Sequence, residues 1–136
     1  MSQANVDVVR RGYELYAAGD VEGVARLFSE EAEMPDAGGL GLADTAVGSV
    51  YGPAGFLQAN DEALEAFEDY RVEAERFIDA GPAVVVPVRI SGRGRASGAR
   101  LEMGLAHAWL LRHGKVIRGE VHRTTQEALE SVGCSE

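Results

Sequence analysis

The sequence has little cysteine, no long hydrophobic run and no basic leader. Its one cysteine, Cys134, cannot form an internal disulfide, so nothing in the chain requires an oxidising compartment. No apolar stretch approaches the roughly 20 residues that span a bilayer. Residues 1–20 carry scattered charges rather than a basic start followed by an apolar middle. We therefore expect a cytoplasmic protein that has no membrane as a partner.

Positive charge is also scarce. The chain has 13 Lys and Arg against 22 Asp and Glu, a net charge of −9. A field of that sign repels polyphosphate, so we expect no nucleic-acid partner. With 136 residues, 46% of them hydrophobic and 26% charged, the composition is that of an ordinary folded domain. The length suits one core, and we predict a single domain over residues 1–136.

The N-terminal part of the chain has helical periodicity. Apolar side chains recur at offsets 0, 3, 7 and 10 in Val6, Val9, Tyr13 and Tyr16. This spacing predicts a helix over residues 5–18. Asp20 can cap a second helix that runs to Ser29. Residues 33–52, rich in glycine, are then predicted to form a long and therefore functional loop, and Pro53 to begin a third helix.

The C-terminal half changes to the alternation typical of strands. We predict antiparallel strands over residues 72–78, 84–90, 101–111 and 115–124. The glycine- and arginine-rich stretch 91–98 is interpreted as a solvated hairpin tip rather than a phosphate site. Thr124 and Glu127 have the spacing of a capping box for a short C-terminal helix. The order of elements predicts an α+β fold in which a curved antiparallel sheet wraps around three N-terminal helices.

The last hairpin indicates which residues share a face. If His113-Gly114 is a two-residue turn, counting outward from it pairs His107 with Glu120, Trp109 with Arg118 and Leu105 with His122. The face that carries these six residues mixes large apolar and ionisable groups, so we place a ligand pocket there. The opposite face would be small and apolar. From it we predict a homodimer through the sheet, formed by Ala106, Ala108, Ile117, Gly119 and Val121.

Several short motifs, spread over nearly the whole chain, resemble one known family. They are Tyr16-Ala-Ala-Gly-Asp20 with Leu27-Phe28, Glu33-Met-Pro-Asp36, Tyr51-Gly52-Pro-Ala-Gly-Phe56, Ala106-His-Ala-Trp-Leu110 and Gly114-Lys-Val-Ile117. Together they resemble the SnoaL-like family of the nuclear transport factor 2-like superfamily. The resemblance implies a cone-shaped α+β barrel whose mouth binds small molecules. That superfamily includes polyketide cyclases, ketosteroid isomerases, epoxide hydrolases, dehydratases and members without catalysis, so the fold does not fix the activity.

The resemblance suggests roles for two residues and departs from the family patterns elsewhere. Asp36 falls where ketosteroid isomerases carry the aspartate that moves a proton, and His107 falls near their oxyanion-hole acid. Their oxyanion tyrosine aligns with Gly12, which leaves Tyr16 one turn along. The acidic residue of the cyclases aligns with Thr124. The Asp-Arg-Asp arrangement of the epoxide hydrolases is absent, since Arg89 is followed two residues on by Ser91.

Three residues are the catalytic candidates. Asp36 would be the base for proton transfer at carbon, although an aspartate after a proline in a glycine-rich loop can equally be a turn residue. A His107–Glu120 pair would serve as general base and orienter, or only as a structural cross-strand pair. Arg118 over Trp109 would contact substrate, or support the sheet by a cation–π contact. The predicted substrate-binding residues are Tyr16, Tyr51, Trp109, Arg118 and His122.

No cofactor is needed for this chemistry, and we expect no metal. His122 and His107 with one glutamate are too weak a ligand set to indicate zinc. Two functions stay open. The first is a cofactor-independent isomerase, cyclase or lyase that acts on a small, largely apolar carbonyl compound. The alternative is a non-catalytic ligand-binding or dimerisation module with the same cavity.

Overall fold

The computed structural model describes residues 3–35 and 49–133. The helices are α1 (Gln3–Ala17), α2 (Val21–Ala25), α3 (Gly52–Ala66) and α4 (Thr125–Ser131). The strands are β1 (Phe28–Met34), β2 (Val50–Tyr51), β3 (Phe67–Ala74), β4 (Ile78–Ala80), β5 (Ala83–Gly94), β6 (Arg100–Arg112) and β7 (Lys115–His122).

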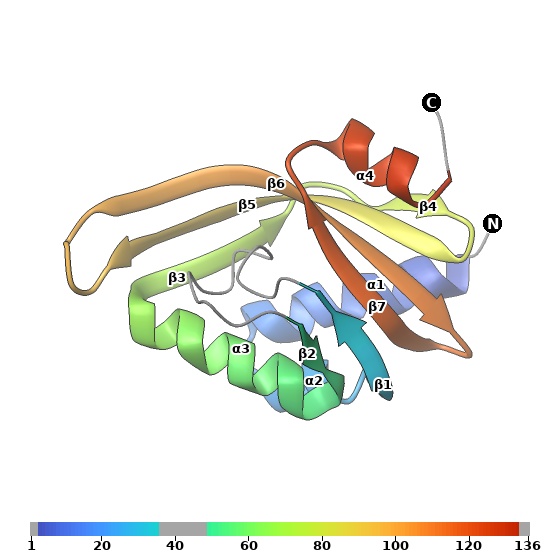
Figure 1. Ribbon diagram of the computed structural model, residues 1–136, viewed down its shortest axis with the longest axis horizontal. Helices are drawn as coiled ribbons and strands as arrows, with labels where there is room; N and C mark the ends of the chain where they lie inside the picture. Colours follow the sequence, from blue (N-terminus) through green and yellow to red (C-terminus); the bar gives the residue numbers. More distant parts are fainter. Residues whose placement is uncertain (1–2, 36–48, 134–136) are drawn as a thin grey trace.

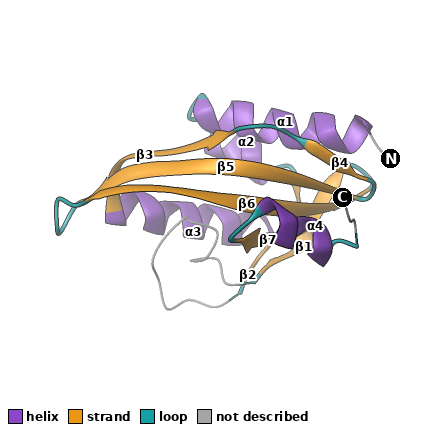
Figure 2. Ribbon diagram, turned by 90° about the horizontal axis from the view of Figure 1, so that it is seen from above, coloured by secondary structure: helices purple, strands orange, loops and turns teal. Residues whose placement is uncertain are grey.

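In these ranges the strands form one curved, unclosed sheet. Their order is β2-β1-β7-β6-β5-β3, with β4 paired to the end of β5. The first three helices lie against one face, here called the inner face, and α4 packs on the opposite, outer face (Figures 1 and 2). The long β5–β6 hairpin projects at the end of the molecule where α3 leads into β3 (Figure 1). The predicted α+β class and its curved sheet are confirmed.

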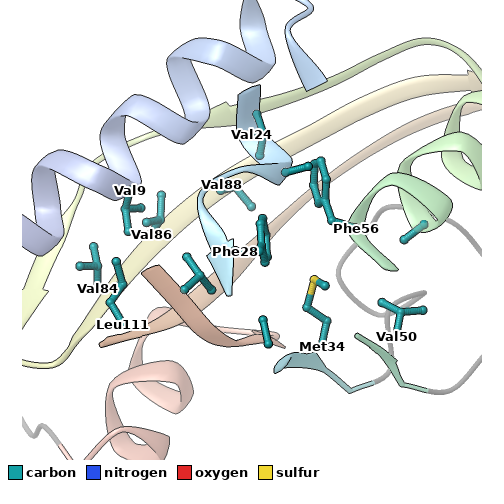
Figure 3. Packing of buried hydrophobic residues seen from close by; sticks show 14 of the residues in the cluster. Val9, Val24, Phe28, Met34, Val50, Phe56, Val84, Val86, Val88 and Leu111 are labelled. Carbon is teal, nitrogen blue, oxygen red and sulfur yellow. The ribbon is translucent and has the colours of Figure 1, made fainter. Parts of the chain in front are cut away.

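The core fills the space between the inner face and the helices. Val84, Val86 and Val88 alternate along β5 and point into the core, because successive side chains of a strand face opposite sides, and Val84 and Val86 lie near Val9 of α1 (Figure 3). Across the core, the ring of Phe28 stacks on Phe56 of α3 with the centroids 5.2 Å apart.

Local capping bounds two helices as the sequence predicts. The Asp20 side chain accepts a hydrogen bond from the Gly23 amide at 2.9 Å, and Thr124 accepts one from the Glu127 amide at 3.1 Å. The predicted extent of the second helix is wrong, however. α2 ends at Ala25, and Phe28 already belongs to β1, which pairs in parallel with β7. The apolar residues after Asp20 fit a helical stripe, but the last of them serve a strand.

The strand predictions hold for the β6–β7 hairpin and fall short elsewhere. β1 and β4 were not predicted, β2 is a short strand inside the predicted loop 33–52, β3 begins at Phe67 rather than at residue 72, and β5 continues to Gly94. The glycine-rich stretch is therefore partly strand, and the turn itself is shorter than predicted. Short edge strands carry too few residues to show an alternation of their own.

The register of the β6–β7 hairpin differs from the predicted one by a single residue. The turn is confirmed: Arg112 pairs with Lys115, and both turn residues have positive φ, 54° at His113 and 76° at Gly114. Beyond Val116 the register shifts, because β7 contains one extra residue, Ile117.

The shift exchanges the faces of every later residue of β7. His107 now pairs with Val121, and Glu120 pairs with Ala108. The predicted pairs of His107 with Glu120 and of Trp109 with Arg118 are therefore wrong.

The predicted dimer face is also wrong. Gly119 and Val121 face inward, and Ala106 and Ala108 lie buried under Leu129 and its neighbours on α4. The small residues of β6 are covered by the chain's own C-terminal helix. Within residues 3–35 and 49–133, no helix is both long and apolar enough to cross a membrane.

Candidate functional site

A cavity of about 70 Å³ lies inside the core on the inner face. It is bounded by the first three helices and by β1, β3, β6 and β7. Its lining residues are Val8, Val9, Gly12, Tyr13, Tyr16, Val24, Leu27, Phe28, Phe56, Val72, His107, Trp109 and Val116. Nearly all of this wall is hydrocarbon or aromatic, so the few polar atoms within it determine which ligand groups can bind.

Three of those polar groups form one hydrogen-bonded network. The Tyr13 hydroxyl lies 2.8 Å from Nδ1 of His107, and Nε1 of Trp109 donates to the same hydroxyl at 2.9 Å. An indole N–H can only donate, so the Tyr13 oxygen accepts this bond, which leaves the hydroxyl hydrogen to be donated to Nδ1. In the other tautomer, His107 donates from Nδ1 to Tyr13 and frees the hydroxyl hydrogen for a ligand oxygen.

Tyr13 is held as a neutral phenol. Burial raises the pKa of its hydroxyl well above the usual 10, and the hydrogen bond from Trp109 offsets only part of that effect. Tyr13 can therefore donate or accept a hydrogen bond in the cavity, but it does not ionise near neutral pH.

Two glycines make room for this arrangement. A Cβ at Gly119 would lie 2.8 Å from Cε3 of Trp109, so the indole can lie against β7 only because residue 119 has no side chain. Gly12 lines the cavity itself, and a Cβ there would meet Leu27 at 3.3 Å. Any larger side chain at residue 12 would occupy ligand space.

A second polar contact adjoins the cavity. The Tyr16 hydroxyl donates to Oδ1 of Asn60 at 2.6 Å, and Asn60 is only 1% exposed. Burial raises the pKa of Tyr16 to about 12, so this phenol also stays neutral.

The predicted ionisable site residues of β7 lie on the outer face instead. Arg118 contacts Glu33 through Nη1 at 2.7 Å and Glu120 through Nε at 2.6 Å, and Nε2 of His122 lies 3.1 Å from Glu120. Burial alone would raise the pKa of the Glu120 carboxyl, but the hydrogen bonds and charges of Arg118 and His122 outweigh it and lower the pKa. Arg118 is thus an ion-pair partner and does not lie over Trp109.

Of the other predicted site residues, some line the cavity and some do not. Tyr16, His107 and Trp109 line the cavity. Tyr51 does not line it and is 58% exposed at the start of α3. Asp36 lies outside the described residues.

Sequence reasoning missed two residues, although each left a signal. Tyr13 lies three residues before Tyr16 on the same face of α1, and it was assigned to the core by its helical spacing. Asn60 interrupts the apolar stripe of α3, and a buried amide in such a stripe requires a polar partner.

No group of three or more His, Cys, Asp or Glu side chains is arranged to hold a metal within residues 3–35 and 49–133. The cavity's polar atoms in these ranges come from tyrosine, histidine and tryptophan. An apolar cavity with a few convergent hydrogen-bonding groups, set between a curved sheet and helices, defines a small-molecule-binding protein.

The comparisons give the family of this binding protein. Residues 9–119 match the SnoaL-like domain, so the chain belongs to the SnoaL-like domain family. A comparison with curated proteins finds no match.

Solved structures share the fold along nearly the whole chain. An NTF2-like protein of unknown function from Burkholderia pseudomallei is 23% identical, with a TM-score of 0.71 and coverage of 97% of this chain and 98% of that one. TerC, co-crystallised with polyporic acid, is 23% identical, with a TM-score of 0.72 and coverage of 96% and 99%. A putative polyketide cyclase from Sinorhizobium meliloti is 19% identical, with a TM-score of 0.67 and coverage of 85% and 94%. At these identities the likeness establishes the fold alone.

Proposed function

We propose that the protein is a cofactor-independent isomerase, cyclase or lyase that moves a proton on a small, largely apolar carbonyl compound. The observation that carries this proposal is the Tyr13–His107–Trp109 network inside an otherwise apolar cavity. Apolar walls strengthen a hydrogen bond to a developing oxyanion, and one such donor typically contributes about 10²–10³-fold to a rate. TerC with its polyporic acid supports binding of a small molecule by this fold.

In the proposed reaction a base takes a proton from the carbon next to the carbonyl. The C–H electron pair forms a carbon–carbon double bond, and the carbonyl π pair moves to oxygen. Tyr13 then donates its hydrogen bond to that oxygen while His107 donates from Nδ1 to Tyr13. The base in this proposal is Asp36, on the resemblance of its motif to that of the ketosteroid isomerases. When the substrate has a double bond beyond that carbon, return of the proton to the far end of this double bond re-forms the carbonyl and shifts the double bond, which completes an isomerisation.

The volume of the cavity limits the ligand. About 70 Å³ is roughly half of the 150 Å³ cavity that holds benzene in a protein core. The cavity is partly open, so a ligand of one ring or more would fill it and extend beyond it.

One observation favours the alternative, a non-catalytic binding module. In the ranges 3–35 and 49–133, no carboxylate lines the cavity, and Glu120 is on the far side of the sheet. Without Asp36, the network would still bind an oxygen atom but would lack a strong carboxylate base.

Deuterium uptake distinguishes the two functions. Phenylacetone has an acidic CH₂ group next to its carbonyl, and its exchange with D₂O can be followed by proton NMR. We expect the wild type to accelerate this exchange, and Tyr13→Phe and Asp36→Asn each to reduce it by about 10²-fold or more. Binding of phenylacetone without exchange above the buffer rate would contradict catalysis and leave the binding module.

Glu120→Gln is the matched control for this assay. The substitution removes a carboxylate of the original site prediction, but Glu120 lies on the outer face. We expect this variant to exchange deuterium at the wild-type rate, whereas a large loss of rate would show that Glu120 belongs to the site.

We also propose a cytoplasmic homodimer, now through a different part of the outer face. A groove of about 320 Å³ there is lined by apolar residues of β6 and by Arg118 and Glu120, so one surface offers both signs of charge to a two-fold partner. Light scattering at micromolar concentration should give a dimer, and Arg118→Glu should give a monomer. A monomeric wild type would contradict the dimer.

A further inference from the structure

Three buried polar side chains continue the cavity at one end. Tyr16 lines the cavity and bonds to Asn60, which lies one helical turn after the lining residue Phe56 on the buried side of α3. Tyr70 lies two residues before the lining residue Val72 on β3, so both point to the inner face and pack on the same core.

The three residues extend the cavity in the same direction. Tyr16 follows Tyr13 along α1, Asn60 follows Phe56 along α3, and Tyr70 precedes Val72 on β3. Each of these steps leads toward the end of the molecule where α3 meets β3 and the β5–β6 hairpin projects (Figure 1). The polar cluster of Tyr16, Asn60 and Tyr70 therefore lies beyond the end of the cavity away from His107, and of the three only Tyr16 lines the cavity itself.

The cluster has more hydrogen-bond donors than acceptors for them. The Tyr70 hydroxyl is buried and has no hydrogen-bond partner within residues 3–35 and 49–133. The Asn60 amide oxygen accepts from Tyr16, and its NH₂ group has no partner among the residues that the structure describes. Burial of Tyr70 and the nearby Tyr16 raise the pKa of the Tyr70 hydroxyl, so it keeps its hydrogen. An unused buried donor such as the Tyr70 hydroxyl costs stability, and native proteins seldom retain one without a function.

We propose that the ligand carries a second hydrogen-bond acceptor, such as a ketone or ester oxygen, and that the Asn60 amide and the Tyr70 hydroxyl bind it. The inference rests on the proposed function of the cavity as a carbonyl-binding site. It adds the class of substrate, a compound with two hydrogen-bond acceptors. The first carbonyl lies at Tyr13 and His107, and the second oxygen lies at the opposite end of an apolar chain. No lysine or arginine of the described residues lines the cavity, which favours a neutral acceptor over a carboxylate.

A matched pair of slender ketones tests this inference. Octane-2,7-dione has an acceptor at both ends, whereas 7-methyloctan-2-one replaces one acetyl group by an isopropyl group of the same shape. Trp109 is the only tryptophan and lines the cavity, so its fluorescence reports the binding of both. The measured quantity is the ratio of the two dissociation constants, monoketone over diketone.

We expect Tyr70→Phe and Asn60→Leu each to lower this ratio by about 3- to 10-fold, the contribution of one hydrogen bond. Tyr13→Phe should weaken both ketones and leave the ratio unchanged. The exposed tyrosine variant Tyr51→Phe is the control and should change nothing.

The outcomes separate the inference from the proposed function. If both ketones bind and neither substitution changes the ratio, the second acceptor site is wrong and the carbonyl cavity stands. If neither ketone binds to the wild type, the proposed function fails and the inference fails with it.

Stability of the ligand-free protein gives an independent test. Tyr70→Phe removes a buried hydroxyl without a partner and should leave the melting temperature unchanged or raise it. A fall as large as that of Tyr13→Phe, whose hydroxyl has two partners, would show that the Tyr70 hydroxyl is already satisfied and would overturn the inference.

Discussion

At the scale of the residue, the chemistry of the cavity depends on one phenol. The Tyr13 hydroxyl joins His107 of β6 to the only indole of the chain, and it does so inside a wall that offers almost no other hydrogen bonds. The same contact therefore fixes the orientation of the imidazole, and in the proposed reaction Tyr13 donates its hydrogen bond to the substrate oxygen. We expect Tyr13 to matter for both stability and binding.

Tyr13→Phe should destabilise the protein by about 1–3 kcal/mol, because Nε1 of Trp109 and Nδ1 of His107 would both lose a buried partner. Urea unfolding followed by Trp109 fluorescence measures this change. Tyr51→Phe removes an exposed hydroxyl and should stay within about 0.5 kcal/mol of wild type. Equal effects of the two substitutions would contradict the network.

The buried phenols predict a loss of stability in alkali. Burial raises the pKa of Tyr16 to about 12 and those of Tyr13 and Tyr70 further, against 10 for a free phenol. An acid whose pKa is higher in the folded state stabilises that state below the unfolded pKa, and the contribution is lost as pH rises through the folded pKa. Unfolding free energy should thus fall from about pH 10 upward. In a tyrosinate absorbance titration, ionisation of these three phenols below pH 11 would contradict their burial.

At the scale of the element, one extra residue in β7 decides which side chains reach the cavity. The turn chemistry of His113-Gly114 could be predicted from sequence, because glycine tolerates the positive φ that such a turn requires. The bulge at Ile117 could not, because it is seen only in how β7 pairs with β6. Counting from the turn therefore placed His107 and Trp109 on the correct face of the sheet, but it placed the later residues of β7 on the wrong face.

Gly119→Ala should test this packing. The new methyl group would overlap the Trp109 ring and force it or β7 to move, at a cost of about 1–3 kcal/mol, with a change in tryptophan fluorescence. Gly104→Ala is the matched control, since the nearest atom to its Cβ is the Val88 carbonyl oxygen at 3.8 Å. An unchanged stability of Gly119→Ala would argue against the register.

The outer-face ion pairs predict a loss of stability in acid. The pKa of Glu120 is lowered in the folded state, so its contribution is present above the unfolded pKa of about 4.5 and is lost as pH falls through the lower folded value. The groups around it are Arg118, Glu33 and His122, and they are partly exposed, so we expect only about 0.5–1 kcal/mol. Glu120→Gln should flatten the pH dependence of unfolding below pH 5, and a curve parallel to wild type would contradict the pairing.

At the scale of the whole molecule, the fold was more predictable than the site. The α+β order and the motifs around Tyr16, Phe56 and Trp109 indicated the family, because they reflect local periodicity and short-range packing. The site depends on contacts between residues far apart in sequence. Tyr13 meets His107 across 94 positions, and Tyr16 meets Asn60 across 44. No pattern within a short stretch of sequence predicts contacts between residues so far apart.

The architecture also explains why the ligand is not proposed to bind in the groove of the outer face. α4 covers the middle of the sheet there, and the remaining ionisable groups pair with one another. The inner face instead has a cavity lined by the Tyr13–His107–Trp109 network, with the polar cluster of Tyr16, Asn60 and Tyr70 next to it. A ligand is thus expected between the sheet and the N-terminal helices.

The central claim is that a carbonyl oxygen binds at Tyr13 and His107. The most direct measurement is the ¹³C NMR shift of carbonyl-labelled phenylacetone bound to the protein. We predict a downfield shift on binding to wild type and to Glu120→Gln, and its loss in Tyr13→Phe, because only a hydrogen bond from the network polarises the carbonyl. The same shift in wild type and in Tyr13→Phe would contradict the account.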